Sequence, residues 1–121
     1  MIIRRGQVWW ADLGTPRGSS PGYERPVVVV QADKLNKTNI KSVIVVISTT
    51  NLRLAKMPGN VFVERGVGGL RDDSVINVTQ VFTLDKLDLL ELLGTLPVEK
   101  LLKIDAGLAQ VFSLDERSTK L

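Results

Sequence analysis

The stretch "GYERPVVVVQAD", residues 22–33, places an arginine and a proline directly before four consecutive valines. A continuous β-branched run is typical of a strand that is buried on both faces. Pro26 fits at the first position of such a strand, where its missing N–H group disturbs the sheet least. Arg25 is always charged and costly to bury, so its position at the start of a core strand needs an explanation.

A second apolar run, "VIVVIS" at 43–48, predicts a strand that pairs with 27–31 as a hairpin across the polar turn 32–42. Three more strands are predicted at 6–13, 60–66 and 74–82. In the last of these, strict alternation places one set of side chains on each face: Val75, Asn77, Thr79 and Val81 against Ile76, Val78, Gln80 and Phe82.

The C-terminal third of the chain predicts a helix. Residues 84–96 are compatible either with a helix or with a turn and a final strand. From Pro97, which suits a first helical position, an apolar stripe follows a helical period: Leu101, Ile104, Leu108 and Val111. The predicted fold class is therefore α+β: five or six antiparallel strands in a small barrel, closed by a C-terminal helix. We expect one domain over 1–114 and a frayed tail at 115–121.

The composition excludes several kinds of chemistry. The 121 residues include no cysteine and no histidine. Disulfides, thiolate nucleophiles and histidine-based catalysis are therefore absent, and a zinc site is not expected. We predict no cofactor, although carboxylates remain compatible with Mg²⁺. A cysteine-free chain without a signal peptide or an apolar run of about 18 residues is expected in the cytoplasm, away from membranes.

Charge is distributed unevenly along the chain. Residues 1–56 hold nine Lys and Arg against three Asp and Glu, net +6, whereas 57–121 hold seven against ten, net −3. A basic half favours an anionic partner such as nucleic acid or an acidic peptide, although a solvated surface can produce the same asymmetry by chance. Two long loops, 14–26 and 49–59, follow strands of one sheet and can converge at one end of it.

An ordered set of motifs resembles a known family. These are "RRGQVWWADL", "GSSPGYERPVVVVQ", "ISTTN", "AKMPGNV" and "DDSVINVTQVFTLDKL". Together they resemble the MazF/PemK toxins, the endoribonuclease components of toxin–antitoxin pairs. The resemblance implies an SH3-like barrel related to the CcdB gyrase poisons. It also implies a homodimer that binds single-stranded RNA along its interface, without a metal, and an antitoxin whose acidic C-terminal segment covers the site.

The resemblance assigns the catalytic pair to Arg25 and Thr49. It implies attack of the ribose 2′-OH on phosphorus, which yields a 2′,3′-cyclic phosphate and a 5′-OH. A guanidinium suits this reaction because it can grip two phosphate oxygens as they gain charge. Ser48 and Thr50 remain rivals of Thr49, because a shift of one residue exchanges them. The general base is left unassigned, since arginine stays protonated.

Further residues are candidates for RNA binding. They are Arg17, Ser19, Ser20, Tyr23, Glu24, Ser48, Thr50, Asn51 and Gln80. Tyr23 can stack on a base and Gln80 can read a base edge, although a solvated loop and an ordinary strand residue are the alternatives. Trp9 and Trp10 are expected in the core or at a dimer interface, on opposite faces of their strand.

Three positions depart from the family pattern. Ser20 stands where an acid is frequent, Glu24 where a neutral or basic residue is frequent, and Phe82 where an arginine is frequent. These changes can alter specificity, slow cleavage or abolish it. Two alternative functions therefore stay open: a CcdB-like toxin that binds gyrase without cutting RNA, and an inactive relative that binds RNA or antitoxin.

Overall fold

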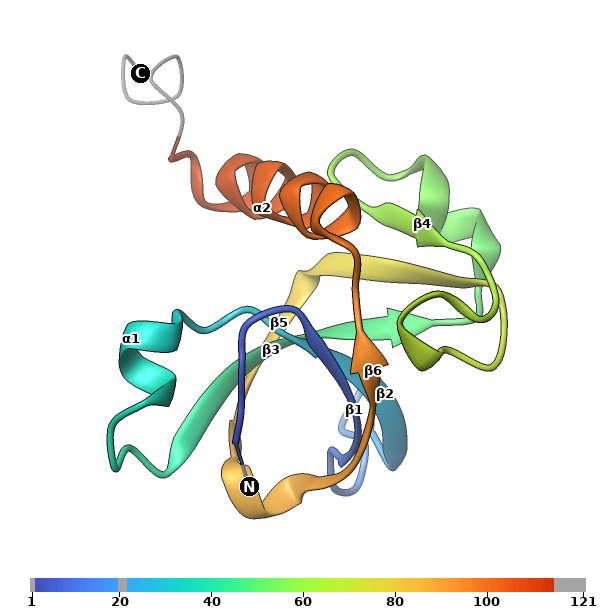
Figure 1. Ribbon diagram of the computed structural model, residues 1–121. Coiled ribbons are helices and arrows are strands. Elements are labelled where there is room, and N and C mark those ends of the chain that lie inside the picture. The colour runs from blue at the N-terminus through green and yellow to red at the C-terminus, as the bar shows by residue number, and fades with distance from the viewer. Residues whose placement is uncertain (1, 20–21, 115–121) are drawn as a thin grey trace.

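The computed structural model describes residues 2–19 and 22–114, so the predicted tail at 115–121 lies outside the described residues. Six antiparallel strands form one sheet in the order β4-β5-β3-β2-β1-β6. The sheet curls into a half-barrel, and the long C-terminal helix lies across one side of it (Figure 1). The strands are β1 Gln7–Asp12, β2 Glu24–Val29, β3 Ser42–Thr49, β4 Val61–Val63, β5 Ser74–Asp85 and β6 Leu89–Thr95. The predicted fold class is confirmed.

The helices lie between and after the strands. They are α1 Asp33–Asn36 and α2 Val98–Phe112, with 3₁₀ turns η1 Leu52–Lys56, η2 Val67–Gly69 and η3 Lys86–Asp88. Pro97 is the residue before α2 rather than its first helical residue. The segment 84–96 adopts the turn-and-strand alternative, because the Asp85 carboxylate accepts the Leu87 N–H at 2.8 Å and starts a tight turn. Among the described helices, none is long and apolar enough to cross a membrane.

The valine run of β2 is buried on both faces of the sheet, as predicted. Val27 and Val29 pack in the core inside the barrel, together with Trp9, Val45 and further apolar residues. Val28 faces the other way, into a second core. Ile104 of α2 is fully buried in that second core, so the helix stabilises the sheet by covering its outer face.

Strand β2 begins at Glu24, three residues before the predicted start at 27. Ala11 of β1 pairs with Arg25, and Trp10 pairs with Pro26. Arg25 is therefore part of the sheet and not the last residue of a loop. Its backbone is fixed by a neighbouring strand as well as by the proline that follows it.

The predicted alternation in β5 is wrong beyond Val78. Opposite β3, Val46 pairs with Val81 while the next residue, Ile47, pairs with Asn77. The extra residues form a bulge, which reverses the faces of the strand. Val78 and Val81 consequently both pack in the outer core, and the side chain of Phe82 turns to the inner core.

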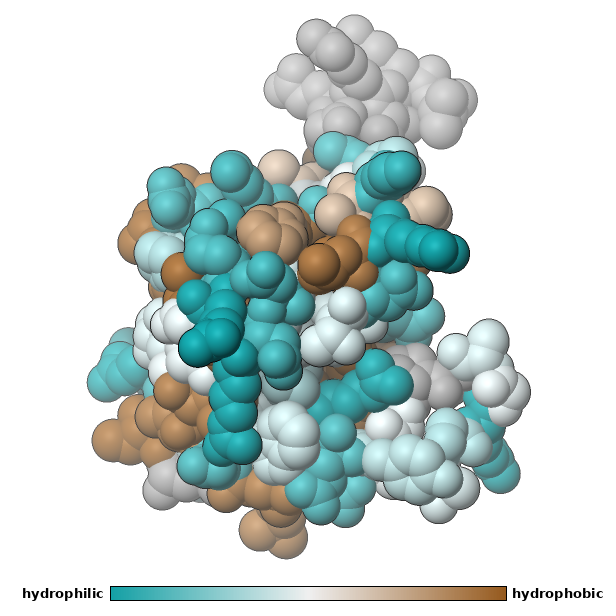
Figure 2. Space-filling model, turned by 90° about the vertical axis from the view of Figure 1, so that its right-hand side faces the viewer, coloured by the Kyte–Doolittle hydropathy of each residue, from teal (hydrophilic) through white to brown (hydrophobic). Residues whose placement is uncertain are grey.

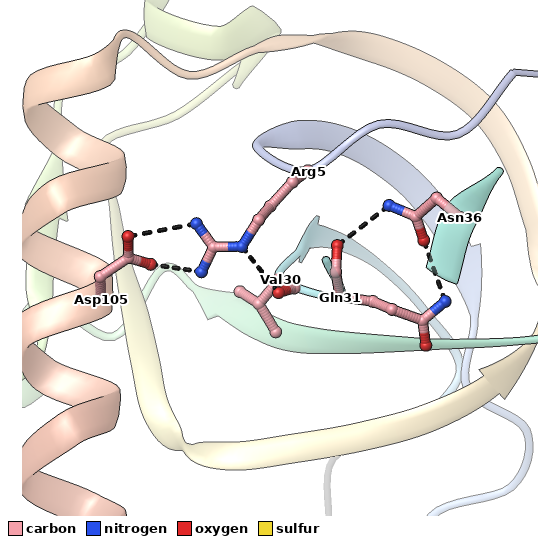
Figure 3. Close-up of polar contacts among 5 residues, drawn as sticks. All are labelled: Arg5, Val30, Gln31, Asn36 and Asp105. Carbon is pink, nitrogen blue, oxygen red and sulfur yellow. Dashed lines mark hydrogen bonds and ion pairs between the residues drawn. The ribbon is translucent and has the colours of Figure 1, made fainter. Parts of the chain in front are cut away.

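Arg5 fastens α2 to the sheet. Its Nη1 donates to Asp105 Oδ2 at 3.1 Å, Nη2 forms an ion pair with Oδ1 of the same carboxylate, and Nε donates to the Val30 carbonyl at 2.9 Å (Figure 3). The Arg5 N–H also donates to Asp33 Oδ1 at 2.7 Å. This bond, followed by one from the Asn36 side chain, lowers the pKa of Asp33 below its usual value.

Candidate active site at the ends of strands β2 and β3

Arg25 and Thr49 come together at one end of the sheet. Val27 pairs with Ile47, and continuing this antiparallel register by two residues sets Arg25 opposite Thr49. Both residues line the same two hollows. The Trp10 hollow has a volume of about 490 Å³ and also contains Trp10, Tyr23, Glu24, Ser48, Thr50, Arg71 and Asp72. The Gln80 hollow has a volume of about 290 Å³ and also contains Ser19, Leu54, Asn77 and Gln80.

Arg25 is half-buried, and only one of its side-chain nitrogens is engaged. Its Nε donates to the Gly22 carbonyl at 3.3 Å. Within residues 2–19 and 22–114, its two Nη atoms have no hydrogen bond and no carboxylate partner. The side chain is thus oriented by the loop, while its two terminal nitrogens remain available to an anion in either hollow.

The hydroxyl groups near Arg25 differ in how far they are already engaged. The Ser48 side chain is 3% exposed, and its hydroxyl donates to the Pro26 carbonyl at 3.0 Å. The Thr49 hydroxyl is half-buried and accepts the Asn51 N–H at 3.1 Å, so its proton is still free to be donated. Thr50 is exposed in the Trp10 hollow only. Of the three, Thr49 alone lines both hollows with Arg25.

Backbone hydrogen bonds hold the loop before β2 next to the hollows. The Tyr23 N–H donates to the Gly14 carbonyl at 2.6 Å, and the Tyr23 carbonyl accepts from Leu13 at 2.8 Å. Gly22 must be glycine, since a Cβ there would stand 2.4 Å from the Pro16 backbone nitrogen. Tyr23 itself has a positive φ of 60° and a side chain that is 69% exposed at the mouth of the Trp10 hollow.

The structure brings some of the predicted RNA-binding residues into the hollows and leaves others out. Ser19 lies in the Gln80 hollow, whereas Arg17 is exposed and lines neither hollow. Asn51 also lies outside both hollows, and its side chain caps η1 by accepting the Arg53 N–H at 3.3 Å. Ser20 lies outside the described residues.

Gln80 reaches the site because of the bulge in β5. The bulge is held by side chains: Asn77 Oδ1 accepts the Thr79 hydroxyl at 2.8 Å, and Asn60 Oδ1 accepts the Val78 N–H at 3.0 Å. Gln80 and Asn77 therefore face the same hollow, next to Arg25 and Thr49. Bulges re-aim side chains in this way next to active sites.

Glu24 is tied to an aromatic neighbour. Trp10 Nε1 donates to Glu24 Oε1 at 2.6 Å inside the Trp10 hollow. Trp9 instead packs in the inner core, where its Nε1 donates to Gln7 Oε1 at 2.9 Å. The two tryptophans thus point to opposite faces, as predicted, and Trp10 belongs to the site.

The family model of the PemK-like, MazF-like toxins of type II toxin–antitoxin systems matches residues 4–112 of this chain. The chain belongs to this family. Among curated relatives, Endoribonuclease MazF6 of Mycobacterium tuberculosis is 44% identical over 114 residues, 94% of this chain and 100% of the relative. Endoribonuclease MazF of Staphylococcus epidermidis is 42% identical over 107 residues, 88% of each chain.

Solved structures of MazF proteins share the fold. An endoribonuclease from Mycobacterial species, in complex with its cognate antitoxin, is 26% identical and superimposes with a TM-score of 0.77 over 93% of this chain and 97% of its own. The family predicted from the sequence motifs is confirmed, and so is the type of enzyme, since the curated relatives are named endoribonucleases.

Four aromatic, amide or charged side chains that line the two hollows were missed by the sequence prediction. They are Trp10, Asn77, Arg71 and Asp72. Trp10 was assigned to the core or an interface, and Asn77 reaches the site only through the bulge. Arg71 and Asp72 follow a glycine-rich turn that gives no local signal of a site.

Proposed function

We propose that this chain cleaves single-stranded RNA at specific sequences, without a metal ion, and that an antitoxin neutralises it. The observation that carries the proposal is Arg25: a half-buried guanidinium with two unengaged Nη atoms, opposite the Thr49 hydroxyl in a hollow. The curated relatives named endoribonucleases support the reaction class.

The reaction requires the RNA, water and the charged and hydroxyl groups of the site. The ribose 2′-OH gives up its proton to water as its oxygen attacks phosphorus, the bond from phosphorus to the 5′-oxygen breaks, and that oxygen takes up a proton from water. The products are a 2′,3′-cyclic phosphate and a 5′-OH end. Arg25 stabilises the negative charge that gathers on the phosphoryl oxygens, and Thr49 donates a hydrogen bond to one of them. A fixed donor of this kind contributes about 3 kcal/mol to transition-state stabilisation in other enzymes.

The RNA follows the rim of the two hollows. Tyr23 offers an exposed aromatic ring on which a base can stack, and Gln80 offers an amide that can bond a base edge. Ser19 and Thr50 offer hydroxyls to phosphate or sugar, and Arg17 adds a long-range positive charge from the loop. Two other predicted contacts have structural roles: the Ser48 hydroxyl donates to the Pro26 carbonyl, and Asn51 caps η1.

Two protein partners belong to the proposal. An antitoxin inhibits by laying carboxylates of an acidic C-terminal segment over Arg25. A second copy of the chain covers apolar side chains that the monomer exposes, including Leu90 and Leu92 on the edge strand β6 and Leu102 on α2. In Figure 2, hydrophobic residues gather near the upper and lower borders of a face that is otherwise mostly hydrophilic.

The test uses the purified chain, a long RNA without stable structure, and EDTA. We expect cleavage at a small set of sequences, with 5′-OH ends that polynucleotide kinase labels directly and cyclic phosphates at the 3′ ends. The cleavage rate of Arg25→Ala should be several hundred times lower than that of the wild type. Arg65→Ala removes an exposed arginine outside both hollows and should keep the wild-type rate.

Intact RNA after incubation with the wild-type chain, or equal cleavage by Arg25→Ala, would refute the nuclease. Salt-sensitive RNA binding without cleavage would instead select the inactive relative. Inhibition of gyrase with intact RNA would select the CcdB-like alternative.

A further inference from the structure

The Trp10 hollow contains an anchored carboxylate that the cleavage chemistry does not use. Glu24 Oε1 accepts the indole N–H of Trp10 at 2.6 Å, a short bond of the kind that charged acceptors form. The residue is exposed, and within the described residues Glu24 has no cationic partner. One carboxylate oxygen is thereby oriented, and the second remains an open acceptor at the wall of the hollow.

Glu24 does not neutralise its neighbour in sequence. Consecutive residues of a strand point to opposite faces, and the side chain of Glu24 is held toward Trp10 while that of Arg25 is held toward Gly22. The site therefore keeps a cation and an anion on neighbouring residues of one strand, and within the described residues the two form no ion pair. Arg25 and Arg71 attract a phosphate to their part of the Trp10 hollow, whereas Glu24 and Asp72 repel a phosphate from theirs.

The group that fits beside Glu24 is therefore a nucleobase and not the backbone. The indole of Trp10, together with Leu70 and Leu93, gives the hollow apolar walls of the kind on which bases pack. A carboxylate accepts hydrogen bonds and cannot donate them. It accepts a hydrogen bond from the exocyclic amino group of cytosine, adenine or guanine, whereas uracil has a carbonyl oxygen where cytosine has its amino group and offers only its N3–H as a donor.

We infer that Glu24, positioned by Trp10, selects an amino-bearing base and rejects uracil at one position of the RNA next to the scissile phosphate. This inference rests on the proposed function, because it assigns the base specificity of the same site. It also explains why an acid is tolerated in a cleft that binds a polyanion: the carboxylate contacts a base edge while Arg25 contacts the phosphate.

The first experiment measures binding and does not depend on cleavage. Single-stranded DNA 10-mers of deoxycytidine and of deoxyuridine lack the 2′-OH nucleophile, and their bases differ in the amino group that Glu24 would contact. Fluorescence anisotropy should give about tenfold tighter binding of the wild-type chain to the cytosine oligomer. Glu24→Gln can donate to a carbonyl, so its two affinities should agree within about twofold. Trp10→Phe, which removes the orienting N–H, should fall between these results.

Two variants serve as matched controls. Glu99→Gln makes the same chemical change on the exposed first turn of α2, outside both hollows, and should keep the tenfold preference. Asp72→Asn alters the other carboxylate of the Trp10 hollow. If the preference disappears in Asp72→Asn and persists in Glu24→Gln, the assignment to Glu24 is overturned.

The second experiment reads the cleavage motif by sequencing the 5′ ends of RNA fragments. The wild-type motif should lack uracil at one position, and Glu24→Gln should admit it there. A wild-type chain that cuts RNA with the same motif and the same binding preference as Glu24→Gln would overturn the inference and leave the nuclease standing. The opposite outcome is that the wild-type chain cuts no RNA, while its cytosine preference in binding disappears in Glu24→Gln. That outcome would overturn the nuclease alone.

Discussion

Arg5, in the turn before β1, and Arg25, in β2, are two arginines that the fold treats in opposite ways. All three side-chain nitrogens of Arg5 bond to protein partners: two to the Asp105 carboxylate and one to the Val30 carbonyl. Arg25 has a single weak bond, at 3.3 Å, to the Gly22 carbonyl. Both side chains are oriented, but only Arg25 keeps two nitrogens for a ligand.

The difference shows what separates a structural arginine from a functional one. A guanidinium with a carboxylate partner in reach stabilises the fold and is already satisfied when a ligand arrives. A guanidinium held by its backbone and by one carbonyl is ordered without being neutralised, so a phosphate gains the full electrostatic interaction. Four variants test this difference between Arg5 and Arg25, in decreasing order of expected effect.

The largest effect is expected for Arg25→Lys. Lysine keeps the charge but loses the planar fork, so we expect RNA cleavage to fall about 100-fold, which corresponds to about 2.7 kcal/mol of transition-state stabilisation. The free energy of unfolding from urea titration should stay within about 0.5 kcal/mol of wild type, because the side chain contributes little to the fold. A large loss of stability with unchanged cleavage would reverse the roles assigned to the two arginines.

Arg5→Ala should show the opposite pattern. Loss of the bonds to Asp105 and Val30 should lower the free energy of unfolding by about 2 kcal/mol, a moderate value because both charged groups are partly exposed. Cleavage well below the melting temperature should remain within about threefold. Asp105→Ala and the double variant complete a cycle, whose coupling energy should be about 1 kcal/mol. Additive single effects would mean that the pair does not hold α2 to the sheet.

Thr49→Val tests the hydroxyl next to Arg25 while keeping the size and β-branching of the side chain. We expect cleavage to fall about tenfold, or about 1.4 kcal/mol, since one neutral hydrogen bond to the phosphoryl group is lost. Thr50→Val is the matched control and should change the rate less than Thr49→Val does. A greater loss in Thr50→Val would move the catalytic role to Thr50.

The smallest effect is expected at Asp33, which stabilises the Arg5 end of the molecule. Its pKa is lowered by the Arg5 N–H and the Asn36 side chain, so its stabilisation is complete above the unfolded value of about 3.9 and is lost as the pH falls through the lower folded value. Asp33→Asn should reduce stability by about 1 kcal/mol at pH 7 after screening by solvent. Urea titrations of both proteins should give a smaller difference in stability as the pH falls below about 3.9. A difference that persists undiminished down to the lowest pH at which both proteins fold would exclude the charged hydrogen bonds as its cause.

The sequence motifs predicted more of the site than composition or periodicity did. The R-P step and the Thr-Thr step named Arg25 and Thr49, and the structure places the two residues in the same two hollows at one end of the sheet. Local pattern failed where long-range contacts decide the outcome. The bulge in β5 is held by Asn60, a residue 18 positions from Val78, and strand periodicity alone does not report such a contact.

The sequence by itself determined five of the six strands, the terminal helix and the double burial of the valine run, because side-chain periodicity and β-branching act over a few residues. Only the tertiary structure decided which partner each charged side chain bonds. Glu24 and Arg25 are adjacent in the chain, yet the first bonds Trp10 and the second Gly22, while Arg5 meets a carboxylate 100 positions away. The electrostatic state of a side chain depends on the partners that folding brings within hydrogen-bond distance, and these partners are set by the packing of the whole sheet.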